Sequence, residues 1–141
     1  LCSIENSTNI KELVQSGAMQ GWNCENGNAN PNDYCHGKWT GIECNNDGDN
    51  ALNYPFNESV KSVDLKDLKI EGTLPDVLTL LYHTEGFDVS GNKLYGTMPG
   101  IGSKDNLKSL DLSDNYFAGT IPSDFDDLHN LTVVSIGIVT V

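Results

Sequence analysis

Gly96-Thr97-Met98-Pro99 is one of three copies of a four-residue pattern, and the others are Gly72-Thr73-Leu74-Pro75 and Gly119-Thr120-Ile121-Pro122. The prolines of the copies lie 24 and then 23 residues apart. A fixed period of this size is typical of proteins that stack one supersecondary unit per repeat. The sequence therefore predicts a solenoid, in which each unit contacts its neighbours and a long regular surface stays open to solvent.

A short strand is predicted upstream of each copy. The equivalent segments, aligned on the prolines, are Val63-Asp64-Leu65, Phe87-Asp88-Val89 and Leu110-Asp111-Leu112. Apolar residues on either side of a polar one are typical of a strand with one buried face. We expect the apolar residues to stack in a shared core, and a fourth strand to begin at Leu131 and run to Ile136.

Asn92 and Asn115 follow the second and third strands at the same repeat position. An inward asparagine has donors and an acceptor that satisfy backbone groups where the chain bends out of a strand. We therefore expect these side chains to form a ladder along the axis of the stack. Leu68 holds this position in the first repeat, where a neighbouring capping structure would make the loss tolerable.

Residues 1–59 form a head without repeats. Its cysteines are Cys2, Cys24, Cys35 and Cys44. Three pairings are possible, and we expect the first two cysteines to form one disulfide and the last two, which flank Trp39, to form the other. A zinc site is the competing interpretation, but there is no Cys-x-x-Cys spacing and His36 is the only nearby histidine. Trp22 and Trp39 are expected to cover the open end of the repeat stack.

A short helix is predicted in this head, from Asn9 to Ser16. Asn9 is its expected N-cap, and Glu12 stands at the third helical position, as in a capping box. Gly17 is the expected stop of the helix.

Three N-glycosylation acceptor patterns point to a secretory environment. They begin at Asn6, Asn57 and Asn130. Together with an even number of cysteines, they favour a secreted or cell-surface protein. The chain lacks the run of roughly 20 apolar residues that a membrane span needs, so no direct membrane insertion of this segment is expected. No signal peptide is visible either, so we expect the chain to begin after a cleavage site or inside a longer precursor.

The composition suits one modest folded domain of 141 residues, with 38% hydrophobic residues and a formal net charge of −12. Phosphate backbones and anionic membrane surfaces repel a chain of this charge, so nucleic acid is excluded as a partner. The charge fits either a cationic partner or simple solubility.

The repeats closely resemble the plant-type leucine-rich repeat, whose pattern is Leu-x-x-Leu-x-Leu-x-x-Asn-x-Leu-x-Gly-x-Ile-Pro. The best copy consists of Leu107, Leu110, Leu112, Asn115, Phe117, Gly119, Ile121 and Pro122. The head resembles the N-terminal cap of that family in its early helix and in Trp22, Cys35, Trp39, Gly41, Ile42 and Cys44. Here the spacing from Cys35 to Trp39 is two residues longer, the Cys2–Cys24 pair is additional, and residues 45–59 look like an insertion. These departures favour a lineage outside the flowering plants, an alga or another protist.

The resemblance implies an α/β solenoid, a right-handed leucine-rich repeat superhelix with a parallel concave sheet and a disulfide-braced N-terminal cap. Residues 1–59 would be the cap, and residues 60–141 would hold three full repeats and the beginning of a fourth. Such domains occur as receptor ectodomains, secreted inhibitors of wall-degrading enzymes, ice binders and matrix components, so the fold does not settle the function.

The concave face is the candidate binding surface. Its candidate residues are Ser62, Asp64, Lys66, Asp88, Ser90, Ser109, Asp111 and Ser113, with Ser135 beyond them. Because parallel strands lie about 4.8 Å apart, the three aspartates are expected to form a column. The column would bind calcium or a basic peptide, or it is part of the repeat consensus, which is the favoured interpretation. Aromatic hot-spot residues are missing from this face.

Two other patterns lie outside the concave face. Thr73, Thr97 and Thr120 form a regular column, and such arrays can match an ice lattice, but this one is only three long and belongs to the repeated pattern. Tyr95 and Tyr116 either form a lateral patch or pack as part of the repeat. The sequence holds no nucleophile elbow or phosphate loop, so no catalytic residues, metal or cofactor are expected.

The chain stops in an apolar, strand-prone run over residues 133–141, whereas a solenoid normally closes with a polar unit. Either the chain is the start of a longer repeat protein, or this run docks on another subunit. The predicted function is a non-catalytic extracellular protein-binding or scaffold module whose partner is another protein or subunit. The alternative is the ligand-recognition ectodomain of a receptor, or a secreted inhibitor of a wall-degrading enzyme.

Overall fold

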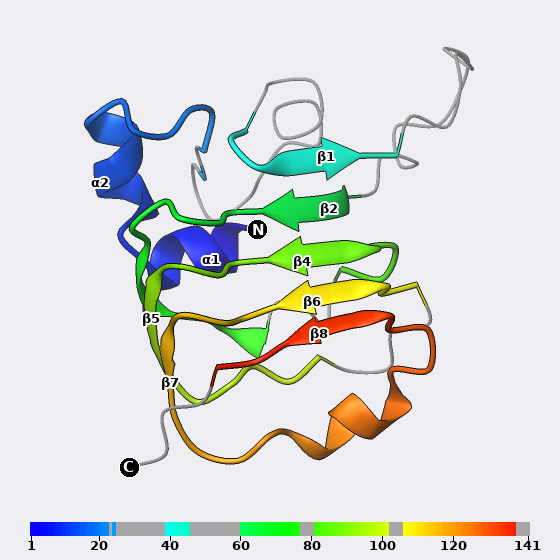
Figure 1. Ribbon diagram of the computed structural model, residues 1–141. Helices are drawn as coiled ribbons and strands as arrows, with labels where there is room; N and C mark the ends of the chain where they lie inside the picture. Colours follow the sequence, from blue (N-terminus) through cyan, green and yellow to red (C-terminus); the bar gives the residue numbers. More distant parts are fainter. Residues whose placement is uncertain (23, 25–38, 46–59, 77–80, 102–105, 138–141) are drawn as a thin grey trace, which may run out of the picture.

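The structure, a computed structural model, describes residues 1–22, 24, 39–45, 60–76, 81–101 and 106–137 (Figure 1). Its main feature is a five-stranded sheet with the order β1-β2-β4-β6-β8. The strands are β1 (Ile42–Cys44), β2 (Val60–Asp64), β4 (Gly86–Asp88), β6 (Ser109–Asp111) and β8 (Val133–Ser135). β1 is antiparallel to β2, and all later pairings are parallel.

The register of the parallel strands follows the sequence period. Val63 pairs with Phe87, Phe87 with Leu110, and Leu110 with Val134. The predicted strand segments therefore stack as expected, and the fourth strand is present but spans only Val133–Ser135.

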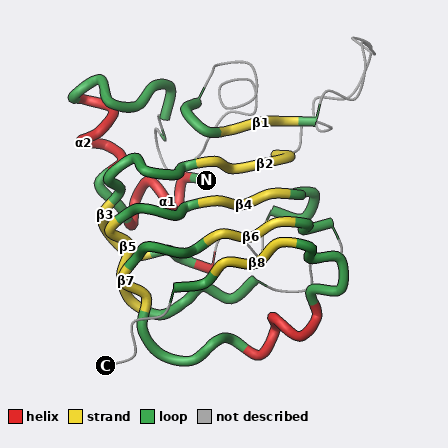
Figure 2. The backbone as a smooth tube through the Cα atoms, viewed as in Figure 1, coloured by secondary structure: helices red, strands yellow, loops and turns green. Residues whose placement is uncertain are grey.

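A second, three-stranded parallel sheet forms the side wall of the stack, where the chain leaves the first sheet (Figure 2). Its strands are β3 (Glu71–Thr73), β5 (Lys93–Gly96) and β7 (Tyr116–Phe117). This sheet was not evident from the sequence, because its strands are too short to show a full alternation of apolar and polar residues. A 3₁₀ helix, η4 (Ser123–Asp127), precedes β8 on the opposite side of the stack (Figure 1).

The apolar core runs along the stack, as predicted. Leu65 and Leu112 are 0% exposed and Val89 is 1% exposed, so all three point into a common interior. Burial of such a side chain stabilises the fold by about 1.5–3 kcal/mol. The same core includes Ile4 and Ile10 from the N-terminal helices and the two tryptophans of the head.

The predicted asparagine ladder is also present. Asn92 Oδ1 accepts from the backbone N–H groups of Leu68 and Ile70. Asn115 Oδ1 accepts from Leu94 N–H at 3.0 Å. Its Nδ2 donates to one carbonyl on the preceding coil and to two carbonyls on its own coil. Each side chain thus ties its own coil to the one before it.

The described part of the head contains two helices, α1 (Cys2–Ser7) and α2 (Ile10–Gln15), where the sequence predicted one. α2 matches the predicted helix, and Gly17 follows it with φ 79°. Asn9 is the N-cap residue of α2, as predicted, but its side chain makes no capping bond to the helix. Instead its Oδ1 accepts from Glu71 N–H and its Nδ2 donates to Lys69 O, so Asn9 satisfies the backbone around β3.

The predicted Cys2–Cys24 disulfide is present. Cys44 is also disulfide-bonded, while Cys35, its expected partner, lies outside the described residues. Trp22 and Trp39 are each 2% exposed, and their ring centroids lie 4.9 Å apart. The Trp22 indole donates to Thr40 O at 2.9 Å, which fixes this pair beside β1.

Candidate binding surface on the five-stranded sheet

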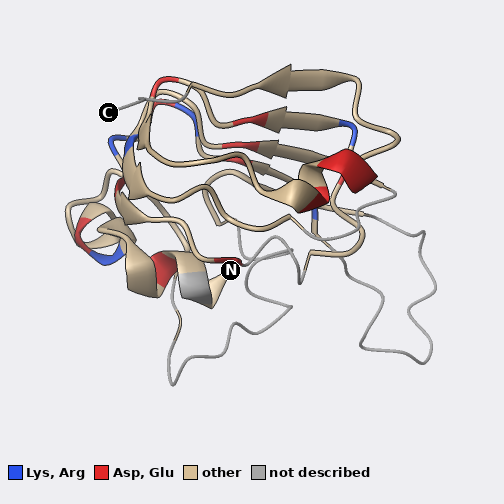
Figure 3. Ribbon diagram, turned by 90° about the horizontal axis from the view of Figure 1, so that it is seen from below, with Lys and Arg blue, Asp and Glu red and all other residues tan. Residues whose placement is uncertain are grey.

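The outward residues of the five-stranded sheet form regular columns, and we call this surface the sheet face. One column consists of Asp64, Asp88, Asp111 and Ser135, and the next of Ser62, Gly86, Ser109 and Val133. Figure 3 shows the acidic positions side by side on neighbouring strands. The predicted column of aspartates is therefore present, next to a column in which three of the four residues are serine or glycine.

The aspartates are bonded within their own turns. Asp88 Oδ1 accepts from both the backbone N–H and the hydroxyl of Ser90, at 2.8 and 2.6 Å. Asp111 Oδ1 accepts from Ser113 in the same way, at 3.0 and 2.6 Å. Such side-chain-to-backbone bonds stabilise the turn that follows a strand. The geometry thus gives the aspartates a structural role, whatever else they contact.

The candidate residues differ in how far solvent reaches them. Asp64 and Lys66 are exposed, whereas Ser62, Asp88, Ser109, Asp111 and Ser113 are half-buried. The prediction that Ser90 belongs to the exposed surface is wrong, because Ser90 is only 3% exposed. Its carbonyl accepts from Asp67 N–H on the preceding coil, and its hydroxyl is held by Asp88, so neighbouring chain covers it.

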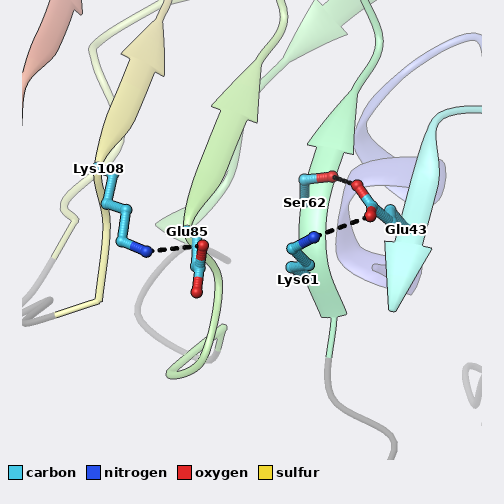
Figure 4. Close-up of polar contacts among 5 residues, drawn as sticks. All are labelled: Glu43, Lys61, Ser62, Glu85 and Lys108. Carbon is cyan, nitrogen blue, oxygen red and sulfur yellow. Dashed lines mark hydrogen bonds and ion pairs between the residues drawn. The ribbon is translucent and has the colours of Figure 1, made fainter. Parts of the chain in front are cut away.

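A row of alternating charges borders the sheet face where the chain enters the strands (Figure 4). It consists of Glu43, Lys61, Glu85 and Lys108. Lys61 Nζ lies 3.0 Å from Glu43 Oε1, and Lys108 Nζ lies 2.9 Å from Glu85 Oε2. This row was not predicted, although Lys61, Glu85 and Lys108 alternate in charge at one repeat position of the sequence.

The first ion pair of this row changes the pKa of both partners. The hydrogen bond from Lys61 lowers the pKa of the Glu43 carboxyl, and the Ser62 hydroxyl adds to the effect. The same bond raises the pKa of the Lys61 ammonium. Because the Glu43 pKa is lower in the folded chain, the ionised carboxylate stabilises the fold at a pH above its unfolded pKa. This stabilisation is lost as the pH falls through its folded pKa. The raised lysine pKa stabilises the fold below the pKa that Lys61 has in the unfolded chain, and this stabilisation is lost as the pH rises through the folded pKa.

Substitution of Lys61 by methionine is expected to raise the Glu43 pKa toward its ordinary value, because both the hydrogen bond and the positive charge are lost. Side-chain carboxyl NMR titration measures this directly. Lys108→Met is the matched control, since Lys108 contacts Glu85 rather than Glu43. An equal rise of the Glu43 pKa in both variants would contradict the assignment of this pair.

Other exposed side chains lie on the side wall and directly after its strands. Tyr95 and Tyr116 are register partners on β5 and β7, and they are 51% and 60% exposed. Thr73, Thr97 and Thr120 are also exposed, but the register partner of Thr73 on β5 is Tyr95 rather than Thr97. The tyrosines form an exposed lateral pair, as one of the two interpretations expected.

Over the described ranges, histidine, cysteine and acidic side chains nowhere gather in threes that could hold a metal ion. None of the helices in this part of the chain is long and apolar enough to cross a membrane.

Comparison with known proteins defines the class of repeat. Residues 106–128 match the Leucine Rich Repeat family. The chain is 38% identical over 89 residues to MDIS1-interacting receptor like kinase 1 of Arabidopsis thaliana, which covers 63% of this chain and 7% of that protein. It thus spans a small part of that relative's length.

The fold is shared with solved plant structures. A chain in the BIR3–SERK2 complex from Arabidopsis thaliana matches with a TM-score of 0.70 and 26% identity, over 99% of this chain and 69% of that one. The BIR2 ectodomain from the same plant matches with a TM-score of 0.68 and 23% identity, over 99% and 67%. The fold is therefore that of leucine-rich repeat ectodomains. Among these, the chain is similar to ectodomains of plant receptors.

Proposed function

We propose that this chain is a non-catalytic extracellular binding module of the leucine-rich repeat type, whose sheet face contacts another protein or subunit. The observation that carries the proposal is the match to a chain of the BIR3–SERK2 complex over 99% of the present chain. That structure is a complex of two proteins, and a regular outward surface on a rigid stack suits the same kind of use.

The proposal includes the division of the chain into a cap at residues 1–59 and a right-handed repeat superhelix at residues 60–141. Several contacts of the head support it. β1 pairs antiparallel with the first repeat strand and so covers that edge of the parallel sheet. Ile4 and Ile10 enter the repeat core, and the Cys2–Cys24 disulfide ties α1 to the segment that follows α2. A cap with these contacts shields the first coil from water.

The binding surface in this proposal consists of the candidate residues without Ser90, which is buried. Charge selects the kind of partner. The ammonium groups of Lys61 and Lys108 are paired with glutamates, so they offset little of the negative charge of the aspartate column. A partner that presents lysine or arginine side chains to the sheet face complements this surface.

A receptor ectodomain is the second candidate function. The 38% identity to a receptor-like kinase favours recognition of a ligand over a purely structural scaffold and over an enzyme inhibitor. Either use places the module outside the cell, secreted or at the cell surface, and neither requires a cofactor.

Removal of two charges from the sheet face is expected to weaken binding about tenfold, because each aspartate would face a cationic group of the partner. The Asp64→Asn, Asp88→Asn double variant keeps the oxygen atoms that accept the turn hydrogen bonds. The native chain is first used to capture its partner protein from the extracellular fluid of the cells that produce it. The dissociation constant of each variant for that partner is then measured.

The matched control is the double variant Asp126→Asn, Asp127→Asn. It removes the same charge from exposed positions on η4, which lies away from the sheet face. An equal loss of affinity in both variants would show that net charge alone matters, and unchanged affinity in both would remove the sheet face as the binding surface.

A further inference from the structure

Two oxidisable phenol rings stand on adjacent strands of the side wall. Tyr95 on β5 and Tyr116 on β7 are register partners in a parallel pair of strands, and both side chains are more than half exposed (Figure 2). We propose that these two side chains form an intrachain dityrosine cross-link when the protein meets hydrogen peroxide and a haem peroxidase. This modification of the side wall does not depend on which partner the sheet face binds.

The backbone around the tyrosine pair is fixed. Leu94 N–H donates to Asn115 Oδ1 at 3.0 Å, just before the pair. Ala118 N–H donates to Gly96 O at 2.9 Å, just after it. Bonds between the two coils therefore lie on both sides of the tyrosines, and they hold the two backbones at the spacing of about 4.8 Å that neighbouring parallel strands have. The strands cannot slide past each other without breaking these bonds.

The two phenols also leave the wall on the same side. Leu94, which precedes Tyr95, and Phe117, which follows Tyr116, are buried in the core. Because successive residues of a strand point to opposite faces, both tyrosines point to solvent. Exposed side chains change rotamer within nanoseconds, so the two rings meet often while their backbones stay in place. Coupling within the chain is therefore favoured over coupling between molecules.

The cross-link is an oxidation of two phenols by one peroxide. The oxidised haem takes one electron and one proton from each tyrosine hydroxyl, which leaves two phenoxyl radicals. A carbon–carbon bond forms between the ring carbons next to the two oxygens. The hydrogens on these carbons leave as protons, and the oxygens take up protons in their place. In total the chain loses two hydrogen atoms, and hydrogen peroxide is reduced to two molecules of water.

Tyr82 supplies an internal comparison. It is exposed as well, but it precedes β4, whereas the side wall begins only after that strand has ended. Among the described tyrosines, Tyr95 and Tyr116 are the ones that pair across a sheet. Tyr34 and Tyr54 lie outside the described residues, as does the glycosylation acceptor Asn57.

The cross-link would join two consecutive coils of the stack, because β5 and β7 belong to neighbouring repeats. In the unfolded chain the same bond closes a loop and removes many of its conformations, which favours the folded state. The cross-linked chain is therefore expected to unfold at a higher urea concentration than the untreated chain.

The test uses the purified chain at low concentration, treated briefly with hydrogen peroxide and a haem peroxidase. The monomer is isolated by size exclusion and digested, and peptide mass spectrometry locates the cross-link. The expected result is a peptide pair that joins Tyr95 to Tyr116 and has lost two hydrogen atoms, with the blue fluorescence of dityrosine in the monomer. If the treated monomer lacks this peptide pair, or the two tyrosines are linked only between molecules, the proposal is wrong.

Variants then locate the bond independently. Tyr95→Phe and Tyr116→Phe keep the ring but lose the hydroxyl that is oxidised, so the monomer of each should lose the fluorescence. Tyr82→Phe is the matched control and should keep it. Equal fluorescence in all three variants would place the link elsewhere and overturn the assignment.

Urea unfolding tests the effect of the bond on the stack. Treatment should raise the urea midpoint of the wild-type monomer and leave that of Tyr95→Phe unchanged. If treatment leaves both midpoints unchanged, the cross-link does not hold the two coils together, and that part of the proposal fails.

Discussion

Replacement of Asn92 by alanine is expected to lower the free energy of unfolding by about 4 kcal/mol, because each buried group left without its partner costs about 1–3 kcal/mol. Asn92 is 5% exposed. Its oxygen accepts from two backbone N–H groups, and its amide donates to the carbonyls of Leu65, Val89 and Ser90. Alanine offers none of these groups, and buried Ile70 N–H would then have no acceptor.

Urea unfolding followed by tryptophan fluorescence measures this loss, since both tryptophans of the head are buried in the folded chain. Asn106→Ala is the matched control. Asn106 is exposed and makes one bond, to Tyr82 O, so its removal should cost less than about 1 kcal/mol. Equal destabilisation by the two substitutions would show that the ladder does not hold the coils together.

The parts of the fold that the sequence predicted are those that repeat. The stacking of Val63, Phe87 and Leu110 and the inward asparagines follow from one rule, since a residue at a fixed place in the period meets its counterpart one coil away. Each copy of the pattern supports the others. The strands, the apolar core and the column of aspartates could therefore be read from the sequence before the structure was known.

The parts that the sequence did not predict are single events. Asn9 has the features of a helix cap, but its side chain bonds Lys69 O and Glu71 N–H more than fifty residues away. A local pattern cannot show that a distant strand needs a donor and an acceptor. The α1 helix was not predicted for a similar reason. It is only six residues long, so its stability depends on burial of Ile4 in the repeat core rather than on its own sequence.

The sheet face lies between these cases. Its positions follow from the period, but the accessibility of each side chain does not. Ser90 and Ser113 occupy the same repeat position and bond their aspartates identically, yet Ser90 is buried and Ser113 is half-buried. Both serine carbonyls accept from the preceding coil, through Asp67 N–H and Gly91 N–H, so exposure at this position differs even where the backbone contacts repeat.

Replacement of Gly41 by alanine is expected to lower the free energy of unfolding by about 4 kcal/mol, the range of severe overpacking with backbone strain. Gly41 has φ 79°, where a Cβ costs about 1–2 kcal/mol. A Cβ here would also overlap the carbonyl oxygen of Asp64 and approach Leu65 Cδ2 to 2.9 Å. The backbone of β2 cannot yield, because Asp64 N–H donates to Gly41 O at 2.7 Å.

Gly17→Ala separates the two contributions. Gly17 also has φ 79°, but a Cβ there would meet no atom within 4 Å, so only the backbone strain of about 1–2 kcal/mol applies. Chemical denaturation of both variants therefore isolates the contact between the head and the first repeat strand. If Gly41→Ala unfolds as readily as Gly17→Ala and no more, the head does not approach β2 closely. The assignment of residues 1–59 as a cap on the repeats would then lose its main structural support.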